Sequence, residues 1–525
     1  MFSTSRNPKT ERRFNIVCGA TGSSCWASRL PSGQEKKKKC LEKVHIRGVD
    51  GWMEAESLQK NRIMELVFID VGQGDGCLLV TPDDRHLIID AGQEDNMFRF
   101  LSWRYGSLKK KLPFQHQVVI THPDADHYYG FRPIFKNKNF DIGAVYHNGI
   151  VEVVGDKLAV LGNITTEKGV DYFTDLIRTT QEMKNKLASP QTEKKQFANL
   201  LRSLVQNHPQ ATIQMVNCEK PSKAEYLPGF GPGNELTIRV LGPVVEKVKG
   251  QPALRGFLAE NSTDVGKTKN GHSVILLLEY KKVRVLLGGD LNSAAETFLL
   301  ATYGGDKDPN KSVKEAKKFF GADVAKSCHH GSHDFTIEFM QAINPVATVI
   351  SSGDEEPHAH PRPDTIGSIG LTSRAPRPLI FSTELARSAP ELPGIPGAQL
   401  RQRYEYWRII ENKQTSVKDR LTAVQALQQM DELFFKDVDD QRQKAWKKLA
   451  DPKAKEGSIS SAAATIKTMD QKFMERSIAT YGAINMRTDG DKVLFAYKIE
   501  KPSRDKKWDI YTLSRDDEGK LMYDR

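Results

Sequence analysis

A short loop of acidic and histidine residues, placed directly after an apolar strand, constrains this chain more than any other feature. The loop THPDADHYYG places His122, Asp124, Asp126 and His127 within six residues. The preceding HQVVI, which starts at His116, is apolar and β-branched and predicts a buried strand. Carboxylates this close together repel one another unless a cation compensates them. We therefore predict a metal site here in preference to a solvated loop.

The spacing within this loop favours two neighbouring ions. After a strand, alternate positions let His122 and Asp124 point one way while Asp126 and His127 reach another point. Such an arrangement suits two metals roughly 3.5–4 Å apart, as in binuclear hydrolases.

Further ligand-type residues follow other apolar strands. Asp290 ends VRVLLGGD, where two glycines allow the backbone a close approach. His329 and His330 end ADVAKSCHH, and His147 ends IGAVYH. Polar residues beyond strand ends are typical of active sites in α/β proteins. Each of them alone would more often be an exposed strand-end residue, but together with the loop they favour one shared site.

The order of expected elements predicts the domain organisation. From Met64, strands such as MELVFIDVG, GCLLVTP and RHLIIDAG alternate with short helices, which indicates an α/β or layered αββα domain over residues 64–390. Residues 171–206 are expected to be a helical insertion in this domain. Residues 398–476 lack strand patterns and predict a helical segment, because RLTAVQALQQMDELFF has the apolar spacing of an amphipathic helix. Residues 477–525 return to β-strands that could complete the hydrolase sheet.

Most of the basic charge lies before the domain. Residues 1–63 hold 13 Lys and Arg against 6 Asp and Glu, so the remainder has 64 basic and 60 acidic residues. The net charge of +11 is therefore a weak argument for nucleic-acid binding. We expect residues 1–63 to be a leader that is disordered or not part of the native protein.

The chain shows no sign of a membrane span or of a disulfide framework. No apolar run approaches the roughly 18–20 residues that a span needs. The six cysteines are scattered and form no CxxC pair, which favours a reducing compartment. We expect a cytoplasmic protein.

The motifs together resemble a known family. THPDADH matches the H-x-[HD]-x-D-H signature of the metallo-β-lactamase superfamily. FIDVGQGDGCLLV with LIIDAG, NGHSVILLLEY with LLGGD, and CHHGSH resemble its ComEC-like branch, in motif order from Glu65 to about Asp364. The resemblance implies an α/β fold, a four-layer αββα sandwich, carrying a binuclear and usually zinc site along one edge; the helical segment would be an addition to it.

The resemblance also implies which residues bind the two divalent ions. The implied ligands are His122, Asp124 and His147 for the first ion, Asp126, His127 and His330 for the second, and Asp290 as the bridge. His330 is favoured over His329, which is left to contact either the substrate or the metal-binding side chains. Asp124 stands where many members have a histidine, and this harder oxygen ligand admits manganese or iron beside zinc.

Three residues are expected to act on the substrate. Asp126 would orient the attacking water as well as bind metal, while His329 and His360, the latter in PHAHPRP, would border the pocket. The alternative for His360 is a surface loop shaped by prolines. Lys326 is a further candidate substrate contact. Asp70, Asp75 and Asp90 are expected either to order the ligands or to fix turns.

We expect a metal-dependent hydrolase that attacks with a metal-activated water, acting on small-molecule or nucleic-acid phosphodiesters. The first alternative is a hydrolase of another ester, such as a lactone, a thioester or a phosphocholine ester, because one fold supports many chemistries. The second alternative is a non-catalytic scaffold with a structural metal, whose helical segment at residues 398–476 binds a protein partner.

Overall fold

The computed structural model describes most of the chain beyond residue 61. The described residues are 62–105, 108, 111–259, 262–353, 359–383, 397–434, 440–481, 483–499 and 506–523. Before them it gives the backbone of five short strands: β1 (Ser5–Arg6), β2 (Arg12–Arg13), β3 (Arg29–Leu30), β4 (Leu41–Ile46) and β5 (Val49–Glu54). The rest of the expected leader, residues 1–63, lies almost entirely outside the described residues, so its disorder stays a prediction.

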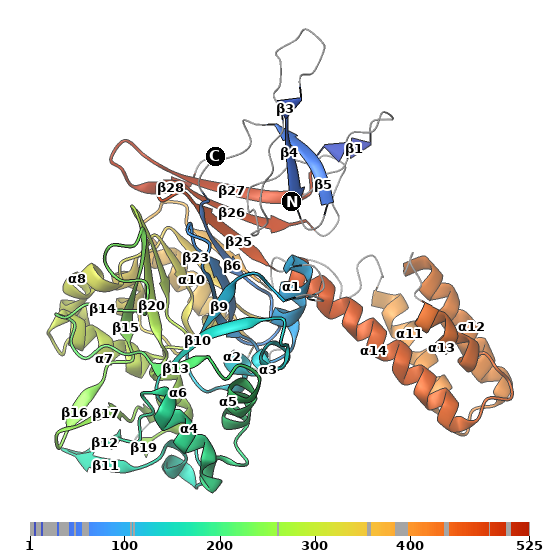
Figure 1. Cartoon of the computed structure of the whole chain (residues 1–525), viewed down its shortest axis with the longest axis horizontal. Coiled ribbons are helices and arrows are strands. Elements are labelled where there is room, and N and C mark those ends of the chain that lie inside the picture. Colours follow the sequence, from blue (N-terminus) through green and yellow to red (C-terminus); the bar gives the residue numbers. More distant parts are fainter. Residues whose placement is uncertain are drawn as a thin grey trace.

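Two sheets form the centre of the molecule (Figure 1). The first contains β6 (Met64–Phe68), β7 (Gly76–Val80), β8 (His86–Ala91), β9 (Gln115–Ile120), β10 (Asp141–His147), β13 (Thr212–Met215), β25 (Ile484–Thr488), β26 (Val493–Lys498), β27 (Trp508–Arg515) and β28 (Leu521–Tyr523). Its strand order is β13-β10-β9-β8-β7-β6-β25-β26-β27-β28. The second contains β14 (Glu225–Tyr226), β15 (Leu236–Gly242), β20 (Ile275–Tyr280), β21 (Val283–Leu287), β22 (Val324–Lys326), β23 (Ala347–Ile350) and β24 (Leu379–Ser382), in that order.

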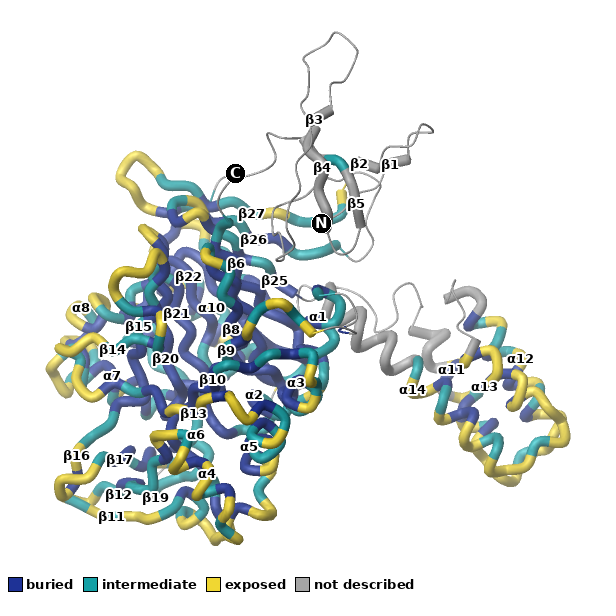
Figure 2. The backbone as a smooth tube through the Cα atoms, in the orientation of Figure 1, coloured by how far each residue is buried: buried dark blue, intermediate teal, exposed yellow. Residues whose placement is uncertain are grey.

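Alternation along the strands explains why the sheets form layers. In MELVFI, Leu66 and Phe68 join a core that also contains Leu276 of the second sheet, while Val67 and Ile69 join a core with the helices. Successive side chains of a strand point to opposite faces, so a strand that is apolar throughout must be covered on both. Figure 2 shows these strands as the most deeply buried part of the molecule.

Helices cover both outer faces. On the first sheet lie α1 (Asn96–Tyr105), α2 (Ala125–Tyr128), α3 (Phe131–Lys136), α4 (Thr180–Ala188) and α5 (Gln196–Asn207). Beside the second sheet are α6 (Val265–Gly271), α7 (Ser293–Gly304), α8 (Pro309–Phe320), α9 (Ile337–Ile343) and α10 (Pro363–Thr372). The predicted four-layer αββα sandwich is confirmed.

Smaller elements decorate the sandwich. They are β11 (Ile164–Glu167), β12 (Val170–Phe173), β16 (Glu246–Val248), β17 (Gln251–Arg255), β18 (Leu258–Ala259), β19 (Ser262–Thr263) and the 3₁₀ turns η2 (Lys157–Leu161), η3 (Pro190–Thr192) and η4 (Cys328–Gly331). The expected helical insertion over residues 171–206 differs at its start. Its first residues form β12, which pairs with β17, because Phe173 is buried beside Leu254.

The additional helical segment is a separate bundle. It consists of α11 (Gly397–Glu411), α12 (Val417–Phe434), α13 (Asp440–Leu449) and α14 (Glu456–Tyr481). Trp407, Leu427, Trp446 and Ile466 are buried in its own core. Figure 1 shows it projecting from the sandwich, with α14 as the connection. The helical segment therefore ends at Tyr481, five residues beyond the expected boundary at residue 476. None of the described helices is both long and apolar enough to cross a bilayer.

A buried ion cluster joins the C-terminal strands to the first strand of the sandwich. β25 pairs antiparallel with β6, which places Arg487 opposite Glu65. The Glu65 carboxylate accepts hydrogen bonds from Arg104 Nη2 at 2.6 Å and from Arg487 Nη2 at 3.0 Å. Burial alone would raise the pKa of Glu65, but the two guanidinium groups hold it well below its usual range.

We expect Arg104→Met to lower the free energy of unfolding by about 3 kcal/mol, because it leaves the buried Glu65 charge only half compensated. Urea unfolding would measure the change. The control is Asp95→Asn, which removes an ion pair with Arg99 at the more exposed start of α1 and should cost less than about 0.5 kcal/mol. Equal losses of unfolding free energy in the two variants would show that burial does not increase the contribution of the Glu65 cluster to stability.

Candidate metal centre

Four ligand-type side chains converge where strands of the two sheets end. Candidate ligand atoms of Asp126, His127, Asp290 and His330 all lie within 4.8 Å of one another. Oδ2 of Asp290 is 3.1 Å from Nε2 of His127 and 3.0 Å from Nε2 of His330. Oδ2 of Asp126 is 3.5 Å from the same His330 nitrogen. We call these four residues the central cluster.

Sharp turns after the strands bring the central cluster together. Asp126 and His127 lie in α2, just beyond β9. Asp290 follows β21 through Gly289, whose φ of +56° and contact with Ser273 leave no room for a Cβ. His330 lies in η4 and itself has a left-handed φ of 54°, which is costly for a residue other than glycine and is typical of functional sites.

The DVGQGD loop supports the cluster from one side. A Cβ added at Gly74 would lie 1.6 Å from the backbone oxygen of Asp126. Only glycine allows this approach. Asp70 accepts a hydrogen bond from the Gly72 amide at 3.1 Å and so helps to shape the turn.

Buried carboxylates contact Nδ1 of both imidazoles in the central cluster. Asp90 accepts hydrogen bonds from the Thr121 amide at 2.8 Å and hydroxyl at 2.7 Å, and lies 2.9 Å from Nδ1 of His127. Nδ1 of His330 lies 3.2 Å from Asp75 and 3.1 Å from the Ser351 carbonyl oxygen. Engaging Nδ1 directs Nε2 into the cluster, as acidic residues do behind metal-binding histidines.

The charges of the central cluster are strongly coupled. Burial would lower the pKa of His127 and of His330, but the surrounding carboxylates, Asp290 foremost, raise both pKa values well above the usual range. Burial would raise the pKa of Asp290, and the two imidazoles hold it well below its usual range. The surrounding carboxylates therefore favour the protonated form of both imidazoles when no metal is bound.

The residues of the central cluster fit a divalent ion. The Nε2 atoms of His127 and His330 are buried and, among the described residues, make no hydrogen bond of good geometry. Two imidazole nitrogens and two carboxylates are a donor set suited to zinc, manganese or iron. An ion here would take the place of the two imidazole protons.

The three residues expected to hold a first ion are arranged differently. His122 Nε2 is 3.8 Å from Asp124 Oδ2, and its ring centre is 4.1 Å from that of His127. His147 is buried, with Nδ1 accepting a hydrogen bond from the Gly149 amide at 3.1 Å. Within the described part of the chain, these residues do not form a cluster as tight as the central one. Their ligand role stays a prediction.

The two histidines expected to contact substrate lie near His330, and their contact with substrate stays a prediction. The ring centre of His329 is 5.8 Å from that of His360 and 6.2 Å from that of His330. Burial lowers the pKa of His329, so this ring is neutral at pH 7. The other histidine of that loop, His358, lies outside the described residues.

Two lysines of the site were not predicted correctly from the sequence. Lys326 was expected to contact the substrate, and Lys269 was not singled out at all. Lys326 is not at the rim: its buried ammonium group contacts Asp75 and donates to the Gly289 carbonyl oxygen at 2.9 Å, so it supports the site from behind. Lys269 contacts Asp124. Because it belongs to no recognisable motif, only the fold reveals it.

A comparison with known families finds one match within the chain. Residues 76–156 match the model of the metallo-beta-lactamase superfamily. The matched stretch includes the THPDADH loop and His147 but ends before Asp290 and His330. The match supports the superfamily, and the cluster fits the metal-dependent hydrolytic chemistry of that group. No curated protein matches the chain.

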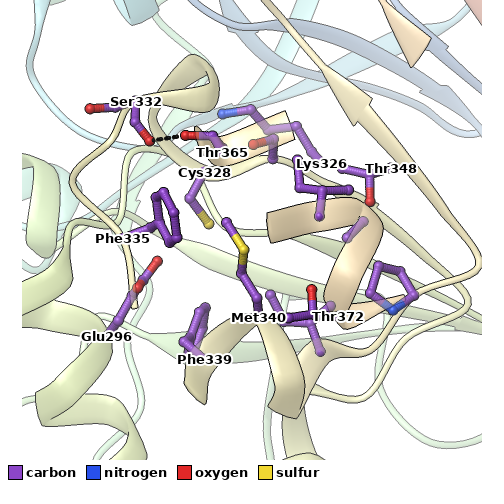
Figure 3. Close-up of a pocket in the computed structure, with 15 residues that line it drawn as sticks. Glu296, Lys326, Cys328, Ser332, Phe335, Phe339, Met340, Thr348, Thr365 and Thr372 are labelled. Atoms are coloured by element: carbon purple, nitrogen blue, oxygen red, sulfur yellow. Dashed lines mark hydrogen bonds between the residues drawn. The ribbon is translucent and has the colours of Figure 1, made fainter. Parts of the chain in front are cut away.

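An apolar cavity adjoins the loop that carries His330 (Figure 3). Its walls include Cys328 and Ser332 from that loop, and Phe339 and Met340 from α9. The buried carboxyl of Glu296 also lines it and accepts a hydrogen bond from the Thr336 hydroxyl at 2.9 Å. The central cluster does not line this cavity, which is therefore separate from the candidate metal site.

We expect metal binding to release protons, because His127 and His330 must lose theirs to coordinate an ion. Adding zinc to the metal-free protein in weakly buffered solution near pH 7 should release about two protons per ion bound, measured with a pH indicator. His330→Ala should release about one fewer. Equal release from the two proteins would contradict the assignment of His330.

Glu296 should make stability depend on pH. Burial raises its pKa from 4.5 to about 8, so between these values the folded protein holds a proton that the unfolded chain has lost. Stability from this group therefore falls as pH rises from about 4.5 to about 8, by at most about 1.4 kcal/mol per pH unit. Glu296→Gln should match the parent near pH 4.5 and exceed it at pH 8 in urea unfolding. Parallel pH profiles would contradict this.

Proposed function

We propose that this protein is a metal-dependent hydrolase whose central cluster binds a divalent ion, and that its substrates are phosphodiesters. The observation that carries the proposal is the convergence of Asp126, His127, Asp290 and His330 at the strand ends. The family match over residues 76–156 supports the hydrolytic class. The motifs DVGQGD and CHHGSH favour the ComEC-like branch, and with it a nucleic-acid or nucleotide-like substrate.

The residues around the cluster have separate roles in this proposal. A divalent ion held by the central cluster would supply the acidity that turns water into a nucleophile at neutral pH. Asp126 is the more exposed carboxylate of the cluster, so it can accept a hydrogen bond from the attacking water and orient it. Asp90 and Asp75 keep the imidazoles fixed through Nδ1.

His329 and His360 supply the substrate side of the proposed mechanism. The ring centre of His360 lies 5.8 Å from that of His329 and 6.4 Å from that of His330, which supports this role. A neutral His329 can donate a hydrogen bond to a non-bridging phosphate oxygen. The same geometry suits the developing charge on a carbonyl oxygen, so hydrolysis of a lactone, thioester or phosphocholine ester remains the alternative chemistry.

Zinc is the proposed ion, with manganese and iron as alternatives. The imidazole nitrogens suit zinc, whereas the carboxylate oxygens of Asp126 and Asp290 also suit manganese. A binuclear centre would need a second ion at His122, Asp124 and His147.

The helical bundle favours binding of a protein partner in addition to hydrolysis. It has its own buried core and stands apart from the sandwich (Figure 2), so it can bind a protein partner without disturbing the cluster. A purely structural metal with no catalysis is the corresponding alternative. A cytoplasmic location also stays a proposal, based on the scattered cysteines.

The test is hydrolysis of a chromogenic bis-aryl phosphate by the purified full chain with zinc or manganese. We expect turnover that chelation abolishes and that Asp290→Asn lowers by at least about 100-fold, because the ion loses a carboxylate ligand. The control Asp308→Asn changes a carboxylate that caps α8, where asparagine caps equally well, and should leave turnover unchanged.

The other outcomes separate the alternatives. No turnover by a protein that still binds metal would overturn the phosphodiester proposal and favour lactones or thioesters as substrates. Turnover that survives both chelation and Asp290→Asn would contradict metal-dependent catalysis at this cluster.

A further inference from the structure

An internal ammonium group occupies the side of the site where a first ion is expected. Helix α6 lies beside the THPDADH loop and places Lys269 against it. The Lys269 ammonium contacts Oδ1 of Asp124 and lies 3.0 Å from Oε1 of Glu152. Its side chain is only 13 % exposed. The lysine is therefore held inside the site by two carboxylates.

The second oxygen of Asp124 is also engaged. The side-chain amide of Asn270 is oriented so that its nitrogen faces acceptors. Nδ2 then donates to Oδ2 of Asp124 at 2.8 Å and to the Gly266 carbonyl oxygen at 3.2 Å. Neighbouring residues of one helix thus occupy both oxygens of Asp124. An ion that binds here must displace a donor or share its oxygen.

The two halves of the site differ in charge. In the half that contains Asp124, the Lys269 ammonium is shared by two carboxylates, those of Asp124 and Glu152, and neutralises one of these two charges. His122 and His147 add no negative charge there. In the central cluster, Asp126 and Asp290 face two imidazoles. Lys326 comes within 3.6 Å of Oδ1 of Asp290, but its ammonium is held by Asp75. A divalent ion is therefore attracted to the central cluster and repelled by the ammonium group beside Asp124.

We propose that Lys269 is an internal cation that takes the place of the first metal ion beside Asp124. The protein then holds one divalent ion tightly at the central cluster and a second only weakly. This inference rests on the proposed metal-dependent function and specifies how the same site is occupied. It makes Lys269 a residue that determines metal stoichiometry, acting through Asp124 and not on the substrate.

Glu152 explains why the lysine stays in the site. It lies just beyond β10, the strand that ends at His147, and its carboxylate is a second partner for the same ammonium group. If Asp124 alone held Lys269, a zinc ion could compete for that one carboxylate. With Glu152 present, displacing the lysine also disturbs a second ion pair.

The experiment measures metal content in the full chain, without reference to activity. The parent protein, Lys269→Met and Lys267→Met are each dialysed against buffered free zinc and analysed by elemental mass spectrometry. Lys267 is the matched control, because it lies on the same helix but pairs with Asp334 at 3.2 Å. We expect one zinc per chain in the parent and in Lys267→Met, and two in Lys269→Met.

Affinities give a second readout. In calorimetric titrations, Lys269→Met should bind the second zinc at least roughly tenfold more tightly than the parent, because one nearby positive charge is gone. Lys269→Gln, which keeps a hydrogen-bond donor for Asp124 without the charge, should behave in the same way. It serves in place of Lys269→Met if that variant does not fold.

The remaining outcomes distinguish the two proposals. Two tightly bound zinc ions in the parent, or one ion in every variant, would overturn the role of Lys269 and leave the metal-dependent hydrolase standing. No zinc in any protein would overturn the proposed function and this inference with it. In Asp290→Asn, the tight ion should be lost whether or not Lys269 limits the second.

Discussion

The face-to-face packing of two sheets is the constraint on which the candidate site depends. Asp126 and His127 follow a strand of the first sheet, whereas Asp290 and His330 follow strands of the second. No stretch of the chain alone contains the cluster. The apolar faces of β6 and β20 make the sheets pack, and this packing brings the strand ends together. Large-to-small substitutions in that core would therefore disturb the site without touching it.

The site also concentrates charge that the interior must compensate. Buried carboxylates and imidazoles are costly unless each has a partner. Here the partners are arranged in pairs: Asp90 with His127, Asp75 with Lys326, and Asp124 with Lys269. At the inner edge of the central cluster, the Nε2 atoms of His127 and His330 that meet Asp290 lack hydrogen bonds of good geometry among the described residues. This arrangement supports the proposal that the central cluster binds a cation.

Local sequence pattern was enough for the fold class and for recognising the ligand-type residues. The alternation in MELVFI and the loop THPDADH each act over a few residues, so an α/β or layered αββα domain could be predicted from them. The four-layer sandwich was implied by the resemblance to the metallo-β-lactamase superfamily. Contacts made by the tertiary fold could not. Lys269 is far from Asp124 in sequence and belongs to no motif, and Lys326 looked like a substrate contact although it is buried beneath Asp290. The start of the helical insertion was misplaced because β12 is short and pairs with the distant β17.

The pairing of β25 with β6 has a consequence for synthesis of the chain. The bundle α11–α14 is inserted between β24 and β25, so it must emerge from the ribosome before the partner of β6 does. Until then, one edge of β6 has free backbone donors and acceptors and can pair with a strand of another molecule. A bundle that folds early on its own core would shorten the path between β24 and β25 and hasten closure of that edge.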